Sequence, residues 1–169
     1  FRILRQVISR LEDEQTGLIT PDFLQEQIPA QRRKEAELAG EVLKDQFSHL
    51  FDQVAQPIST DPTELILNNT WLSALEITGM DGLPEVGKAG NVLRAFTKVK
   101  LALRLPPTIN ATQALEKLSS LLESQAPHSA RITFVADLPN PGWQAPPQQP
   151  ELTAALHRAS NAFFGLPAM

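Results

Sequence analysis

The clearest structural signal in the sequence is the alternation of apolar and polar side chains that begins at Val92 and ends at Leu105. On one side of this stretch lie four apolar residues: Val99, Leu101, Leu103 and Leu105. On the other side lie Lys98, Lys100, Ala102 and Arg104. Because successive side chains of an extended strand point to opposite faces of a sheet, this pattern predicts a strand with one buried and one open face. Two prolines follow directly and end the strand.

Two other stretches, residues 71–78 and 131–138, alternate in the same way and are also predicted to be strands. Four stretches have apolar residues at the spacing of a helix with one buried face: residues 1–12, 29–56, 110–122 and 151–164. Asn110 and Gln113 resemble a capping box at the start of the third helix. The second helix would be about 40 Å long, at about 1.5 Å per residue.

Apart from the long helix over residues 29–56, the predicted order is helix, strand, strand, helix, strand. One more strand at the beginning would give β-α-β-β-α-β, the ferredoxin-like split motif, in which two helices cover one face of an antiparallel sheet. We therefore predict an α+β, ferredoxin-like two-layer sandwich that lacks its first strand and carries an extra long helix.

The length of 169 residues suits one core with an appendage. We predict one domain over residues 1–138, with the helix at 29–56 as an elaboration. Residues 139–150 contain five prolines, which is typical of a linker. A last helical segment occupies residues 151–169. Phe1 already lies inside a helical pattern, without a start signal, and we interpret the chain as a piece of a longer protein whose targeting segments would not be visible.

The composition argues against several classes of partner. The net charge is −4 with 20% charged residues, so there is no broad basic surface for nucleic acid. The basic tripeptide at residues 32–34 precedes two glutamates and is interpreted as a solvated helix face. No apolar run approaches the ~20 residues of a membrane span, and we expect no membrane partner. The chain has no cysteine, which excludes disulfides and thiolate metal sites and fits a reducing compartment. We expect a cytoplasmic location.

The acidic stretch after the first predicted helix could be compared with a calcium-binding loop. If Gly17 takes the sixth position of such a loop, Glu12, Glu14 and Thr16 fall on its first three ligand positions. The closing bidentate glutamate would then fall on Phe23, which has no oxygen ligand to offer. We therefore favour a polar turn after a helix, with Gly17 as the C-terminal stop.

The sequence shows little catalytic chemistry. The three histidines, His49, His128 and His157, fall in separate predicted elements, and none stands beside an acid at the spacing of a metal ligand. We interpret them as surface residues. The sequence has no glycine-rich phosphate loop and no G-x-S-x-G motif. We predict no metal site and no catalytic residue within the chain.

Two residues are candidates for ligand binding. Arg104 lies on the open face of its predicted strand and could bind a carboxylate through two hydrogen bonds, or could simply be a solvated arginine. Asn91 precedes the same strand and could donate a hydrogen bond to a ligand, or could be an ordinary turn residue after glycine.

Three segments together resemble the zinc-dependent metallopeptidase family of carnosinase, carboxypeptidase G, aminoacylase and acetylornithine deacetylase. They are GNVLRAFTKVKLALRLPPTINATQAL from Gly90, GWQAPP from Gly142 and ALHRASNAFFGLPA from Ala155. The first residues, FRILRQVISRLEDEQTGLI, are similar to bacterial dipeptidase-like members. The motifs are individually short, and their order and spacing make the resemblance specific over nearly the whole chain.

The resemblance implies that the chain is the ferredoxin-like lid, or dimerisation, domain inserted into a catalytic domain. That catalytic domain would bind two zinc ions and hydrolyse the amide bond of a peptide or an N-acyl amino acid with zinc-activated water. None of the zinc ligands would lie in residues 1–169, so the fragment would be inactive alone. The helix from residue 151 would re-enter the catalytic domain.

The resemblance also implies roles for the two candidates. Arg104 matches the lid arginine that binds the substrate carboxylate, and Asn91 matches a polar residue at the start of the same strand. The lid histidine that polarises the scissile carbonyl, in a His-Ser-Gly setting on the first strand, is absent from this sequence.

The expected partner is a second copy in a homodimer. Since the missing first strand would be central, its neighbours would have unpaired backbone groups, and we expect either that the remaining strands close together or that a second copy is recruited. The alternative hypothesis is a freestanding ferredoxin-like interaction module that binds peptides or partner proteins through its open sheet face.

Overall fold

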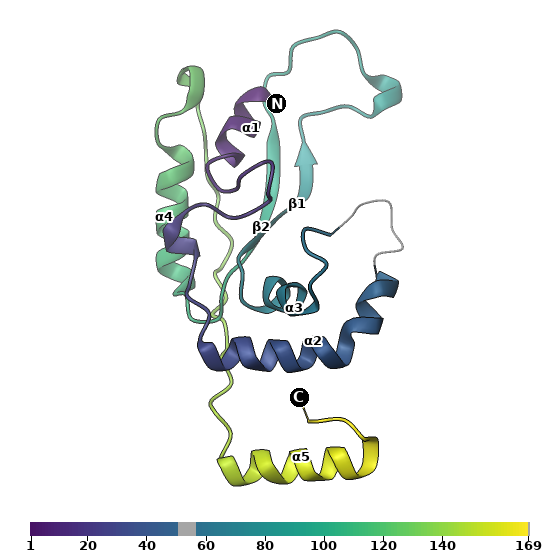
Figure 1. Ribbon diagram of the computed structural model, residues 1–169. Helices are drawn as coiled ribbons and strands as arrows, with labels where there is room; N and C mark the ends of the chain where they lie inside the picture. Colours follow the sequence, from purple (N-terminus) through teal and green to yellow (C-terminus); the bar gives the residue numbers. More distant parts are fainter. Residues whose placement is uncertain (51–56, 169) are drawn as a thin grey trace. The chain divides into compact units, whose positions relative to one another are not determined.

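The computed structural model describes residues 1–50 and 57–168, which form a mixed α+β chain, as predicted (Figure 1). The main elements are α1 (Arg2–Ile8), α2 (Ala30–Leu50), α3 (Pro62–Thr70), β1 (Ala74–Asp81), β2 (Lys98–Arg104), α4 (Ala111–Glu123) and α5 (Pro150–Phe164). Short 3-10 turns occur at η1 (Asp22–Leu24), η2 (Val86–Lys88) and η3 (Pro127–Ser129). The chain divides into two compact units, Phe1–Glu26 with Leu72–Gly142 and Gln27–Trp71 with Trp143–Met169. The predicted lid, linker and re-entering helix remain predictions.

The sheet of the first unit consists of β1 and β2, which pair antiparallel from Ala74 opposite Arg104 to Asp81 opposite Lys98. Side chains of β2 alternate between exposed and half-buried, as its sequence predicts. Both strands differ from their predicted bounds. Trp71 caps the end of α3 and does not begin β1. Val92 belongs to an exposed loop of residues 82–97, so β2 begins six residues later than predicted, at Lys98.

The predicted third strand, residues 131–138, is not a strand in the structure. Ile132 and Phe134 are half-buried against the core, as their alternation predicts, but Leu138 is 91% exposed. Within the described ranges, the backbone of this segment makes no hydrogen bond to the backbone of a strand. The four-stranded ferredoxin-like sheet is therefore not formed by the described residues, and the remaining strands do not close together.

The core of the first unit lies between the sheet and two helices. One buried cluster joins α1 to α4: Val7, Leu11, Leu118 and Leu122. Three sheet residues pack against it: Leu75, Leu101 and Leu103. A second buried cluster contains Ile19, Leu24 and Ala114. Asn110 caps α4 by accepting a hydrogen bond from the backbone N–H of Gln113 at 3.0 Å, so the predicted cap at Asn110 is confirmed.

The second unit is built on α2 and α3, which bury Ala36, Leu67 and Trp71. The helix predicted from residue 29 begins at Ala30 and reaches Leu50; its predicted last turns, residues 51–56, lie outside the described residues. The sequence prediction missed α3, although Asp61 accepts a hydrogen bond from the Thr63 N–H at 2.8 Å and Pro62 occupies the first turn.

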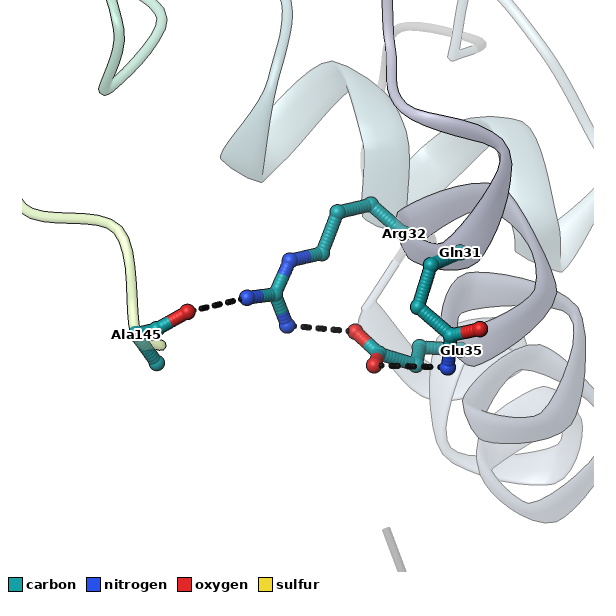
Figure 2. A network of polar contacts seen from close by, with 4 residues as sticks. All are labelled: Gln31, Arg32, Glu35 and Ala145. Atoms are coloured by element: carbon teal, nitrogen blue, oxygen red, sulfur yellow. Dashed lines mark hydrogen bonds and ion pairs between the residues drawn. The ribbon is translucent and has the colours of Figure 1, made fainter. Parts of the chain in front are cut away.

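The basic tripeptide of α2 is more than the solvated helix face that we predicted. Figure 2 shows the Arg32 guanidinium between the Glu35 carboxylate and the Ala145 carbonyl oxygen, to both of which it donates hydrogen bonds. The Arg32–Glu35 contact is 2.6 Å long, and Gln31 donates a second hydrogen bond to Glu35 at 3.1 Å. Arg32 therefore attaches part of the proline-rich segment to α2. Neighbouring Arg33 forms an ion pair with Glu64 of α3 at 2.9 Å.

Candidate functional site

Arg104 is the last residue of β2 and lies opposite Ala74 of β1. Arg104 is exposed and lies on the face of the sheet that α1 and α4 do not cover. Pro106, which follows two positions later, is fully buried and fixes the path of the chain where the strand ends. The structure thus agrees with the predicted position of Arg104 on the open face, while its role in binding remains a prediction.

The open face of β2 carries a row of cations that includes Arg104. Lys98 and Lys100 point to the same side as Arg104, because the three residues are separated by even numbers of positions. Lys98 is opposite Asp81, and Lys100 forms an ion pair with Asp137 at 3.2 Å. Both side chains of the second pair are mostly exposed, at 70% and 83%, so the pair contributes little to stability. This face can attract an anionic group, and the planar guanidinium of Arg104 is suited to a carboxylate.

Asn91 lies in the exposed loop that joins β1 to β2. The loop meets the sheet at Asp81 and Lys98, the end opposite to Arg104, and Figure 1 shows it projecting beyond the sheet there. The seven residues of β2 span about 20 Å at about 3.3 Å per residue. The structure therefore does not bring Asn91 and Arg104 together around one small ligand.

The acidic stretch after α1 forms a polar turn. The Asp13 carboxylate accepts hydrogen bonds from the backbone N–H groups of Gln15 at 3.1 Å and Thr16 at 2.8 Å. It also accepts one from the Thr16 hydroxyl, and this bond is the main reason that the pKa of Asp13 is lowered. Gly17 has a φ of +68°, so it turns the chain within this loop and does not end α1, contrary to the prediction. The loop is closed by a bridge between Glu12 and Ile19.

The described residues do not fit a zinc site. Among the side chains that the structure describes, those of residues 1–47 and 57–168, no three His, Asp or Glu groups lie close enough together to hold a metal ion. His128 is exposed in η3 and His157 is half-buried on α5, while the side chain of His49 lies outside the described part.

An open, polar surface depression of about 450 Å³ lies beside α1 and was not predicted from the sequence. It is lined by Arg5, Gln6, Ser9 and Glu14. Arg5 and Ser9 are four residues apart, a spacing that places them on the same side of a helical turn and was visible in the sequence.

No helix in the described ranges is both long and apolar enough to cross a membrane.

Comparisons with known proteins show a similarity in fold. No family model matches the sequence, and no curated protein matches it. The fold is similar to the crystal structure of an M20 family metallo-carboxypeptidase, Sso-CP2 from Sulfolobus solfataricus, with a TM-score of 0.52 and 18% sequence identity. The similarity covers 72% of this chain and 32% of that enzyme, so the chain corresponds to about a third of the enzyme's length. The chain therefore shares its fold with a part of an M20 metallo-carboxypeptidase.

Proposed function

We propose that this chain is the lid and dimerisation part of a zinc-dependent exopeptidase or amidohydrolase. The observation that carries the proposal is the fold similarity to a metallo-carboxypeptidase over 72% of this chain but only 32% of that enzyme. A match of this kind is expected if the chain is one module of a larger enzyme. The order of the sequence motifs supports the same conclusion, since they resemble the carnosinase and carboxypeptidase G family.

In this proposal Arg104 binds the carboxylate of the substrate. Its position at the end of β2, on the exposed face beside other cations, supports the role because an anion can approach it from solvent. A guanidinium can form two parallel hydrogen bonds with a carboxylate, which fixes the orientation as well as the position of the substrate. Asn91 would contribute a hydrogen bond elsewhere, because a dipeptide is much shorter than β2.

The chemistry itself would belong to another part of the enzyme. Two zinc ions held there would supply an activated water for hydrolysis of a peptide or N-acyl amino acid bond. The chain described here would bind and cover the substrate and would have no activity alone.

The proposal includes a homodimer. Val86 and Leu93, in the loop over residues 82–97, are 94% and 101% exposed, and Val92 and Phe96 are also exposed. Several large apolar side chains exposed on one loop are typical of a surface that another molecule covers. A second copy is the occupant that the proposal assigns to this loop.

The test is a comparison of two substrates in the complete enzyme that contains this chain. Arg104→Ala should raise KM about 10-fold to 150-fold for a dipeptide with a free carboxylate, because a charge-assisted interaction of about 1.5–3 kcal/mol is removed. It should leave KM for the same dipeptide with an amidated C-terminus nearly unchanged, and Arg104→Lys should show an intermediate effect. Equal effects of Arg104→Ala on the KM values of both substrates would show that Arg104 does not bind the substrate carboxylate.

The alternative, a freestanding module that binds peptides through its open sheet face, is favoured by one observation: the exposed residues of β2 carry no covering element within the described chain. Hydrolysis of dipeptides by the complete protein would reject it. Peptide binding without any hydrolysis would support it.

A further inference from the structure

The strand β1 ends at Asp81, and the exposed loop over residues 82–97 begins with Gly82. No other aspartate or asparagine in the sequence is followed by glycine. Asp81 is exposed, so water reaches it. Glycine has no Cβ, which leaves its backbone nitrogen less shielded than that of any other residue. The end of β1 therefore combines an accessible carboxyl group with an unshielded backbone nitrogen.

The backbone nitrogen of Gly82 lies against the carboxyl group of Asp81. Its N–H donates a hydrogen bond to the Oδ1 atom of Asp81 at 2.7 Å. The carboxyl carbon is bonded to this oxygen, so an ordinary hydrogen-bond angle at the oxygen places the carbon about 3–3.5 Å from the nitrogen. Two atoms that are held about 3–3.5 Å apart are close enough to react. The turn therefore holds a nitrogen nucleophile beside the carbon that it can attack.

The fold requires glycine at position 82. Gly82 has a φ of +87°, a conformation that residues with a side chain rarely adopt. A Cβ at this position would lie 2.5 Å from the carbonyl oxygen of Phe96 and 3.2 Å from the Cα of Thr97. Both neighbours are backbone atoms, so no change of side-chain rotamer relieves the contact. A larger residue therefore cannot shield this nitrogen unless the chain before β2 moves.

We propose that Asp81 is a site of spontaneous isomerisation, in which aspartate becomes isoaspartate through a cyclic succinimide. The Gly82 nitrogen attacks the carboxyl carbon of Asp81 and forms a new C–N bond, while the proton of the nitrogen and the hydroxyl of the carboxyl group leave as one water. Water then adds to the main-chain carbonyl carbon of Asp81 and breaks its bond to the nitrogen. Gly82 is afterwards joined to the chain through the former side chain of Asp81. One water is released and one is consumed, so the conversion needs no other reactant.

The product changes the end of the strand pair. An isoaspartyl linkage passes through the Cβ and lengthens the main chain by one atom at the last pair of the ladder, Asp81 opposite Lys98. The close approach of Gly82 to the backbone of Phe96 leaves no space for the longer chain. The beginning of the loop over residues 82–97 therefore has to move away from β2. This proposal is independent of zinc chemistry and of the homodimer.

The test is incubation of the 169-residue chain in heavy-oxygen water at neutral pH for several weeks. Each hydrolysis of a succinimide adds one heavy oxygen atom to the residue, and electron-transfer fragmentation in a mass spectrometer distinguishes isoaspartate from aspartate. Asp137 is the internal control, because it is mostly exposed but precedes Leu138, whose side chain shields the backbone nitrogen. We expect heavy oxygen and isoaspartate to accumulate at Asp81 at least about tenfold faster than at Asp137.

Two further samples separate the effect of the fold from that of the dipeptide itself. A peptide of residues 76–86 contains the same dipeptide but has to find the reactive contact by its own motions. We expect the folded chain to react at least as fast as this peptide, because the fold already holds the contact. Asp81→Glu keeps the charge but would have to close a larger ring, and we expect it to abolish the uptake of heavy oxygen at this position. Amide exchange of residues 99–103 shows whether this variant keeps its strand pair.

Three results would overturn the proposal. Heavy oxygen could enter Asp81 no faster than Asp137, which would show that the nitrogen does not attack the carboxyl group. The folded chain could react more slowly than the peptide, which would show that the turn protects Asp81. Uptake at an unchanged rate in Asp81→Glu would assign the heavy oxygen to direct exchange of the carboxyl group with water.

Discussion

Arg10 is expected to stabilise the first unit by capping the C-terminal end of α4. Its guanidinium donates hydrogen bonds to the carbonyl oxygens of Leu121 at 3.0 Å, Ser124 at 2.6 Å and Gln125 at 2.8 Å, with a longer one to Leu122 at 3.4 Å. The last carbonyls of a helix have no partner within the helix, and a cation there also interacts favourably with the helix dipole. One side chain thus connects the residues after α1 to the end of α4, 111 to 115 positions away.

The expected cost of Arg10→Ala is about 2–3 kcal/mol. A hydrogen bond from a charged donor contributes about 1.5–3 kcal/mol when it is well shielded, and the dipole contributes about 0.3–1 kcal/mol. The bonds to Ser124 and Gln125 are exposed, so water can replace the guanidinium there, and the sum of all four bonds would overestimate the loss. Arg10→Lys keeps the charge but has no planar fork, and we expect it to lose about half as much.

The assay is urea denaturation followed by amide exchange of α4, which reports on the first unit alone. Tryptophan fluorescence reports on the second unit, which contains both the buried Trp71 and the exposed Trp143, and should be unchanged by the substitution. Arg5→Ala is the matched control, because Arg5 is an exposed arginine on α1, and it should change the free energy of unfolding by less than about 0.5 kcal/mol. A loss for Arg10→Ala no larger than that of Arg5→Ala would refute the capping role.

Three further predictions concern single positions. Gln125 has a φ of +43°, so Gln125→Gly should stabilise the first unit by up to about 1 kcal/mol in urea denaturation, and destabilisation would contradict this. Asp61→Ala should cost the second unit about 1 kcal/mol, measured by Trp71 fluorescence, while Asp61→Asn should retain most of the cap. Burial, and then the charge of Glu76, raises the pKa of Glu12 above its ordinary 4.5. Protonated Glu12 therefore makes its full favourable contribution to the free energy of unfolding at pH values below its pKa in the unfolded chain. This contribution is lost as the pH rises through the pKa of Glu12 in the folded chain. Glu12→Gln should accordingly stabilise the first unit at neutral pH and have less effect near pH 3 in the same titration; an equal effect at both pH values would disagree with this reasoning.

Local patterns predicted much of the fold correctly. The alternation around Leu101 and Leu103 correctly predicted which side chains of β2 face the core. Asn110 correctly marked the beginning of α4. These features depend on a few adjacent residues, which is why they are visible in the sequence. The predicted end of this strand at Leu105 is one residue beyond the observed end at Arg104, and the two prolines that follow were its signal.

The incorrect predictions concern contacts between distant residues or competing local signals. Residues 131–138 alternate as a strand should, but a ladder also needs a neighbouring backbone, which the sequence does not reveal. In α3 the apolar residues are too few to show a helical period, so the signal was only the Asp61 cap and the proline after it. The contact of Arg32 with the Ala145 carbonyl joins residues 113 positions apart, and no local pattern indicates such a contact.

The placement of the candidate site was predicted only in part. That Arg104 faces solvent follows from its position in the alternation. The separation of Asn91 from Arg104 also follows, since Asn91 precedes the predicted strand and Arg104 lies near its end. The late start of β2 at Lys98 and the exposed loop before it were not predicted.

The account is tested most directly by zinc content and dipeptide hydrolysis, measured side by side on the 169-residue chain and on the complete protein that contains it. We predict about two zinc ions per subunit and rapid hydrolysis for the complete protein, with neither property in the chain alone. Stoichiometric zinc binding together with hydrolysis by the isolated 169 residues would contradict the account.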